Sequence, residues 1–329
     1  GEACATSLLR WLPAAACLAY GLGAWDADGW VTALWEAVSG TEFAQRPMAE
    51  AYVASFSFAG WIVFFSLADL LPQLEGSRMA KFASDAKPAH LVLTVVAMIL
   101  ATFLAVGEPF GRLLPLVAML VMLACMCLGG TAKLLLEEPG LCSYAFRIWA
   151  TFFVYLGGIA LIHAFKDPRP SDTGPIGFPR LATELGFGLV AYDFVFSWVH
   201  VALHKLGSRF TDHHQHHIIS GFSGRVLALD TVNHGLFDGL LQVLVNIMVQ
   251  NIGIVGAPRH KLSRFLHNIL VTGLLVESHA GYDAFWSSHN LYPGIFGGAK
   301  RHVAHHANGK KYYQQFFCYL DDLLFRFVA

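Results

Sequence analysis

The sequence predicts an all-α fold, an integral membrane bundle of helices that carries a histidine-rich domain facing the cytosol. Three observations favour this fold class. The 329 residues have a mean hydropathy of +0.51, and only 14% of them are charged, whereas a soluble domain has about 25% charged residues. Long apolar runs alternate with polar linkers before residue 200, and histidines recur at helical spacing after it.

The apolar runs approach the roughly 20 residues that a membrane-spanning helix needs. The first run, Trp11–Trp25, is short, follows Arg10 and contains Pro13. We expect it to be a first membrane segment; the alternative is the apolar region of a signal peptide. The other expected spans are Tyr52–Leu71, Leu91–Val106, Leu113–Cys127, Ile148–Phe165 and Leu185–Leu203.

A linker rich in proline and glycine, Lys166–Pro179, is the predicted boundary between two domains. Residues 1–170 form an N-terminal transmembrane region, and residues 171–329 form the histidine-rich domain. Within the second domain, polar side chains recur every four residues in phase with His234, which predicts a helix with one polar face. These side chains are Asp238, Gln242, Asn246 and Gln250.

Charge and cysteine usage narrow the class of protein further. The net charge of −1 gives no overall basic surface for nucleic acid, and the six cysteines form no CxxC pair, so disulfides and zinc–thiolate sites are disfavoured. Basic residues flank the histidines, which places this half in the cytosol by the positive-inside rule. They are Lys205, Arg209, Arg225, Arg259, Lys261, Arg264, Lys300, Arg301, Lys310 and Lys311.

Three histidine clusters are the main functional signal. Their members are His200 and His204; His213, His216 and His217; and His302, His305 and His306. On a helix, spacings of three and four residues place each cluster on one face, within about 6 Å. Eight imidazoles exceed the four ligands of a tetrahedral zinc site, and neutral imidazole suits iron, copper, nickel and zinc. The clusters therefore predict a two-metal centre in a cytosol-facing metal domain.

The alternative interpretation is a histidine-rich tract that binds metal loosely at the surface. Two HxxHH clusters and one HxxxH within about a hundred residues make chance a poor explanation. The isolated histidines are interpreted as ordinary core or surface residues. They are His90, His163, His260 and His267.

The order HxxxH, HxxHH and a terminal HxxHH after several apolar helices resembles the fatty acid hydroxylase/sterol desaturase superfamily. The segment Tyr192–His200 resembles the aromatic lead-in to the first histidine box, and Glu277–Asp283 resembles the HSGYD/N segment. Thr231–His234 is similar to a segment of methylsterol oxidases, and Tyr319–Phe325 to the closing WDRLFGT element. Trp286–His289 and Gly297–Gly298 follow as they do in sterol side-chain hydroxylases.

The resemblance implies two iron ions held by histidines, with zinc as a possible substitute. The implied ligands are the eight box histidines, His279 and, as a tenth candidate, His234. Asp283 is implied either as a ligand or as a carboxylate that orients His279, and it joins the eight box histidines and His279 in the expected catalytic set. His214 and His289 are expected to be spacers.

By the same resemblance, the protein is expected to be a membrane-bound non-haem di-iron oxygenase that hydroxylates a sterol or another lipid with O₂. No haem or flavin motif is present, so electrons are expected from a partner such as cytochrome b5 with its NADH reductase. The implied location is the endoplasmic reticulum membrane with the metal site toward the cytosol. A desaturase of the same superfamily is the alternative, and a membrane metal transporter is a remote one, because no internal repeat is found.

Overall fold

The computed structural model describes residues 2–68, 155–163, 165, 170–206, 213–217, 228–232, 234, 236–254 and 256–325. Within these ranges the regular structure is helical, and β-pairing is confined to isolated bridges. The all-α prediction is therefore confirmed. The expected spans Leu91–Val106 and Leu113–Cys127 lie outside the described residues, as does the first part of Ile148–Phe165.

The described helices follow one another from the N-terminus, with short connections in several places. They are α1 (Glu2–Gly21), α2 (Ala27–Ser39), α3 (Glu42–Gln45), α4 (Ala49–Ala68), α9 (Phe178–Leu206), α10 (His213–His217), the 3₁₀ helix η3 (Ala228–Val232), α11 (Leu236–Asn251), α12 (Lys261–His279), α13 (Ser288–Leu291), α14 (Gly298–Asn308) and α15 (Tyr319–Leu323).

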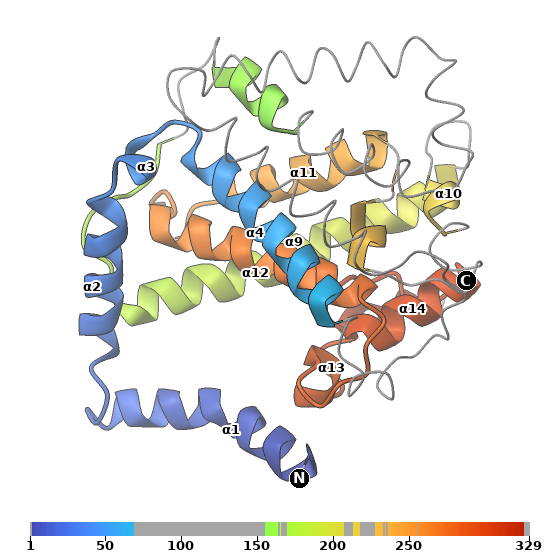
Figure 1. Cartoon of the computed structure of the whole chain (residues 1–329), viewed down its shortest axis with the longest axis horizontal. Helices are drawn as coiled ribbons and strands as arrows, with labels where there is room; N and C mark the ends of the chain where they lie inside the picture. Colours follow the sequence, from blue (N-terminus) through green and yellow to red (C-terminus); the bar gives the residue numbers. More distant parts are fainter. Residues whose placement is uncertain are drawn as a thin grey trace.

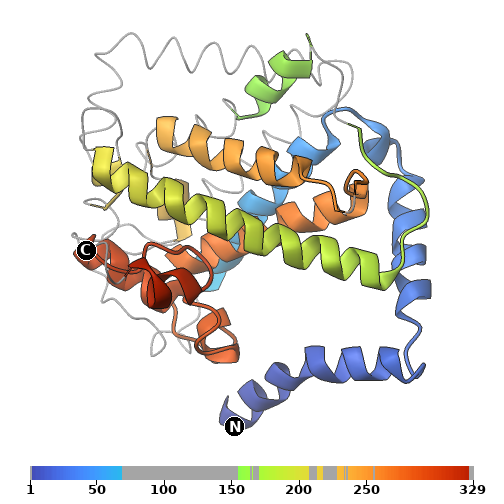
Figure 2. The same cartoon turned by 180° about the vertical axis from the view of Figure 1, so that it is seen from behind.

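Helix α12 lies at the centre of the molecule. It packs against α4 on one side and α9 on the other, and α11 packs against α9 (Figure 1 and Figure 2). Apolar side chains from α9, α11 and α12 fill the space between them and stabilise the arrangement by removing apolar surface from water. This core contains Tyr192, Phe196, Val245, Val249, Val271 and Leu275, and Phe316 from the segment between α14 and α15 packs with them.

A side chain caps the start of each of α9 and α12, a distant one for α9 and a local one for α12. The backbone N–H of Phe178 donates to Asp28 Oδ1 at 2.7 Å, and Pro179 follows in the first turn, where proline is favoured. The side chain of His260 accepts from Leu262 N and so caps α12. The C-terminal end of α9 lies next to α10, and α12 packs against α14 (Figure 1).

Among the described residues, α9 is the helix whose length and hydropathy suit a membrane crossing, and Ala49–Phe65 of α4 is a shorter apolar helix. The expected first segment falls on α1, which lies at one edge of the molecule and contacts α13 (Figure 2). Arg10 fastens α1 there by donating to the carbonyls of Asn290 and Leu291. The apolar side chains of Leu8 and Trp11 on α1 are exposed.

Candidate metal centre

Histidines from four helices converge on one side of the bundle. Helix α9 contributes His200 and His204 from its last turns, and α12 ends on His279. The others come from α10 (His213, His216, His217) and α14 (His302, His305, His306). The structure thus brings together all eight box histidines and His279. It divides them into two groups, each able to surround a metal ion.

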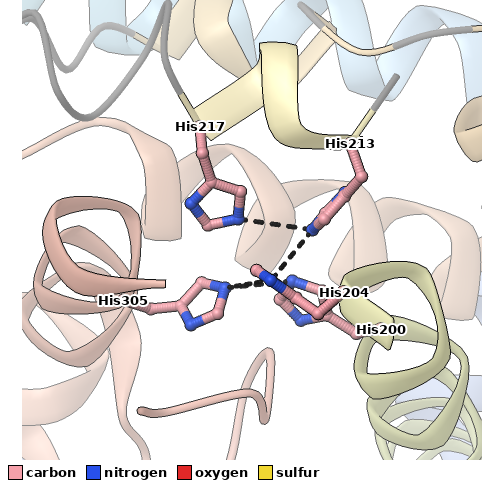
Figure 3. Close-up of side chains that lie close together, drawn as sticks. All are labelled: His200, His204, His213, His217 and His305. Atoms are coloured by element: carbon pink, nitrogen blue, oxygen red, sulfur yellow. Dashed lines mark hydrogen bonds between the residues drawn. The ribbon is translucent and has the colours of Figure 1, made fainter. Parts of the chain in front are cut away.

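The first group has five members, whose ligand atoms all lie within 4.8 Å of one another: His200, His204, His213, His217 and His305 (Figure 3). The Nε2 of His305 lies 3.1 Å from the Nε2 of His200 and 3.1 Å from that of His204. The Nε2 of His213 lies 3.2 Å from that of His204 and 3.3 Å from that of His217. The group therefore joins α9, α10 and α14 through ring nitrogens alone.

The second group has four members, also within 4.8 Å: His216, His279, His302 and His306. The Nε2 of His302 lies 2.9 Å from that of His279 and 3.0 Å from that of His306. The two groups adjoin, because the rings of His217 and His306 stack with their centroids 4.5 Å apart. Neighbouring residues of α10 and α14 thus face different groups.

The hydrogen bonds of the outer ring nitrogens show which nitrogen carries the proton. Nδ1 of His200 donates to Tyr313 O at 2.7 Å, and Nδ1 of His305 donates to Lys311 O at 2.6 Å. Nδ1 of His279 likewise donates to Leu275 O at 2.8 Å. A carbonyl can only accept, so each neutral ring presents Nε2 as a lone pair.

Lone pairs that face one another across about 3 Å repel unless a cation lies between them. Burial also keeps the rings neutral: it lowers the pKa of His279 to about 4 and lowers the pKa values of His302, His305 and His306 well below 6.5. Neutral imidazole is the form that binds metals. The donor set therefore fits two metal ions.

Two buried carboxylates support this arrangement and were not assigned to the site from the sequence. Oδ2 of Asp238 lies 3.3 Å from Nδ1 of His213. Asp193 accepts from the backbone of Phe316 and from Gln314, next to the segment that holds His200 and His305. A signal for Asp193 was present, because it is the single charged residue in the apolar run Leu185–Leu203.

The two remaining candidates, His234 and Asp283, lie outside both groups. The ring of His234 is 6.4 Å from that of His216, and His234 packs against Gly239. Asp283 is exposed; its Oδ1 accepts from His289 Nε2 at 2.9 Å and from Asn290 Nδ2 at 2.6 Å. The Nδ1 of His279 donates to its own helix, which leaves Asp283 without an orienting contact to that ring in the hydrogen bonds described above.

A small apolar pocket lies beside the second group, among α4, α9, α11 and α12. Its volume is about 80 Å³, and its walls include His234, Tyr192 and Leu275, the last one turn before His279. This volume is below the about 300–1,000 Å³ of pockets that enclose a whole drug-sized ligand. The pocket therefore suits one apolar end of a larger molecule.

The described part of the chain is thus helical and brings together two adjoining histidine groups that could each hold a metal ion. The chain is 28% identical to a cholesterol 25-hydroxylase-like protein of Danio rerio over 179 residues, which are 52% of this chain and 65% of that relative. It is 25% identical to cholesterol 25-hydroxylase of Mus musculus (52% and 55%) and 27% identical to that of Homo sapiens (50% and 59%).

The chain thus spans between about half and two thirds of the length of these curated relatives. The relatives are members of the fatty acid hydroxylase/sterol desaturase superfamily, which confirms the resemblance seen in the sequence, at modest identity over about half the chain. No family model matches the chain, and no solved structure matches it.

Proposed function

We propose that this protein is a membrane-bound non-haem oxygenase that hydroxylates a sterol or another lipid at a centre of two iron ions. The observation that carries the proposal is the convergence of Nε2 atoms in two adjoining groups, one of five and one of four histidines. The names of the relatives, cholesterol 25-hydroxylases, support hydroxylation and a sterol or similar lipid as substrate.

The first group would hold one iron, and the second group would hold the other. When bound, the two irons supply the reduction of O₂ and the oxidation of a C–H bond, with two external electrons and two protons completing the balance to alcohol and water. A ligand set of neutral imidazoles leaves the charge of the irons largely uncompensated, unlike the carboxylate-rich sites of soluble bundles.

The protein's own contribution is orientation and exclusion of water. The carbonyls of Tyr313 and Lys311 fix the rings of His200 and His305, and burial keeps the rings neutral. The pocket beside the second group would receive the apolar part of the lipid that is oxidised. Its wall residue His234 would then lie between that lipid and His216.

The proposal also includes the domain organisation of the enzyme, its membrane location and its electron donor. A division into a transmembrane region, residues 1–170, and a di-iron domain, residues 171–329, fits a substrate that enters from the bilayer. The apolar helix α9, which carries His200 and His204 near its end, supports a site at the membrane surface. We place the enzyme in the endoplasmic reticulum with the site toward the cytosol and with cytochrome b5 and its reductase as electron donor.

Lipid profiling of cells with and without the protein tests this function. Expression of the wild-type chain should produce a new hydroxylated lipid, and the His305→Ala variant at equal abundance should not. His260→Asn is the matched control, because asparagine can also cap α12 and His260 lies outside both groups. It should retain the product.

The nature of the product decides between the alternatives within the superfamily. A new double bond in place of a new hydroxyl would replace the hydroxylase with a desaturase. No new lipid from iron-loaded protein, supplied with a reductase and a panel of sterols and fatty acyl lipids, would contradict the proposal.

A further inference from the structure

A short segment after α14, residues 311–317, connects the first histidine group to the rest of the protein. Its first and third residues, Lys311 and Tyr313, supply the carbonyls that accept from His305 and His200. These two histidines come from different helices, α14 and α9, and meet with their Nε2 atoms 3.1 Å apart. The position of this segment therefore fixes the mutual orientation of two proposed ligands.

The backbone between those two carbonyls is strained. Tyr312 has a φ of +61°, and it is the one residue other than glycine with positive φ in the described part of the chain. For an L-residue with a large side chain, this conformation costs energy and persists where surrounding contacts hold it. The ring of Tyr312 lies under the guanidinium of Arg301, 5.2 Å from ring centroid to Cζ. Hydrogen bonds from other parts of the protein hold the segment in place.

The strongest anchor is Asp193, a fully buried carboxylate on α9. Its Oδ1 accepts from Phe316 N at 2.6 Å, and its Oδ2 accepts from Gln314 Nε2 at 2.5 Å and from Phe317 N at 3.4 Å. Hydrogen bonds to a charged group are the strong ones in proteins. One carboxylate thus binds three residues of the segment to the same helix that carries His200.

A second branch leads to the other histidine group. Gln315 Nε2 donates to Ser278 Oγ at 2.8 Å, and Ser278 directly precedes His279. Asp193 itself bonds to Gln314, Phe316 and Phe317 but has no bond to Ser278 among the interactions described. The segment therefore contacts the two histidine groups through different residues: Asp193 binds it on the side of the first group, and Gln315 binds it to Ser278 beside the second group.

We infer that Asp193 is a positioning residue that orients His200 and His305 through residues 311–317 and so makes the first group competent to hold its metal ion. The inference rests on the two-metal part of the proposed function and is independent of the substrate. It assigns a role to the one charged side chain of the apolar run Leu185–Leu203, which otherwise would be costly to bury there.

The isosteric variant Asp193→Asn tests this role. An amide keeps one oxygen acceptor, but its NH₂ group would face the Gln314 NH₂ donor or the backbone N–H of Phe316, where no hydrogen bond forms. The segment should shift, and metal content of purified full-length protein should fall from about two to about one per chain. The variant Gln314→Glu, which sets a second carboxylate against Asp193, should have the same effect.

Combining the two changes gives a rescue. In the double variant Asp193→Asn/Gln314→Glu, the introduced amide can donate to the introduced carboxylate, while its oxygen still accepts from Phe316 N. Metal content should return toward two per chain. Recovery would show that the loss comes from this donor–acceptor pair and not from either substituted side chain alone.

Two further measurements locate the effect. Glu184→Gln changes a buried carboxylate of the same helix that accepts from His260 N and Arg180, away from both groups, and it should keep two metals. In the His305→Ala background, which already lacks a first-group ligand, Asp193→Asn should remove no further metal.

The inference is overturned if Asp193→Asn and Gln314→Glu each retain two metals, if the double variant stays at one, or if Glu184→Gln loses as much. A wild-type protein that holds fewer than two metals would instead contradict the two-metal proposal. The two failures are thus distinguishable without any measurement of turnover.

Discussion

The carboxylate of Asp238 on α11 lies 3.3 Å from Nδ1 of His213 on α10, and both side chains are buried. Burial lowers the pKa of His213, so the ring is neutral, and its Nδ1 is the ring nitrogen that lies near the carboxylate. The remaining nitrogen, Nε2, lies among the other ring nitrogens of the first group. From this position, the Asp238 carboxylate could orient His213 when the ring binds a metal ion.

Replacing Asp238 with asparagine should therefore weaken the first group. The amide keeps the shape but removes the negative charge 3.3 Å from Nδ1 of His213, and loss of an outer carboxylate lowers metal affinity or activity about 10–100-fold. Metal content and turnover of the purified variant measure this. Asp283→Asn is the control, because Asp283 is exposed and bonds to His289 and Asn290 outside both groups. Equal loss in both variants would contradict the assignment.

Removal of one ligand from either group should abolish turnover. His305→Ala affects the first group and His216→Ala the second, and each variant removes one ring nitrogen from a proposed metal site. Turnover and melting temperature should be recorded together. His260→Asn is expected to keep wild-type turnover because it preserves the cap of α12. If all three variants lose turnover to the same degree, stability and not ligation is being measured.

The role of His234 can be tested from two sides. His234→Ala should leave two metals per chain but lower turnover, because its ring lies 6.4 Å from that of His216 and outside both groups. Gly239→Ala should have the same phenotype, since a Cβ there would approach Cε1 of His234 to 2.5 Å and displace the ring. Loss of one metal in the alanine variant of His234 would make that residue a ligand.

Stability of the metal-free protein should fall as the pH drops below 6.5. Burial lowers the pKa of His279 to about 4 and depresses those of His213, His302, His305 and His306. Between the folded and unfolded pKa values, the unfolded chain binds more protons, so the free energy of unfolding rises with pH.

Outside α9, two largely buried carboxyls oppose this trend, because burial raises the pKa of Glu277 and raises that of Asp321 to about 7. The five histidines outnumber them. Thermal unfolding of metal-free protein between pH about 7.5 and about 5 measures the balance. A melting temperature that is constant or that rises on acidification would contradict the neutral histidine groups.

The sequence predicted the helical class and the three boxes because both depend on local spacing. His302, His305 and His306 share one face of α14 whatever surrounds that helix. The sequence could not predict that His216 and His217, neighbours on α10, would face different groups, because this division depends on how α10 sits between α9 and α14. For the same reason, the polar stripe of α11 was recognised while the contact of Asp238 with His213 was not.

Asp193 shows a different limit. Its position in an apolar run marked it as unusual, but its partners Gln314 and Phe316 are more than 120 residues away in the sequence. The positive φ of Tyr312 likewise carries no local sequence signal, since glycine is the residue expected there. Outer contacts of this kind depend on the tertiary structure.

The most direct test of the central claim is the number of metal ions in the purified wild-type chain, expressed with adequate iron and measured by elemental analysis against protein concentration. Two histidine groups predict about two irons per chain, with zinc counted in their place where it substitutes, because simple affinity favours zinc over ferrous iron. A value near two supports the account. A fully loaded protein that holds one metal ion, or none, would contradict it.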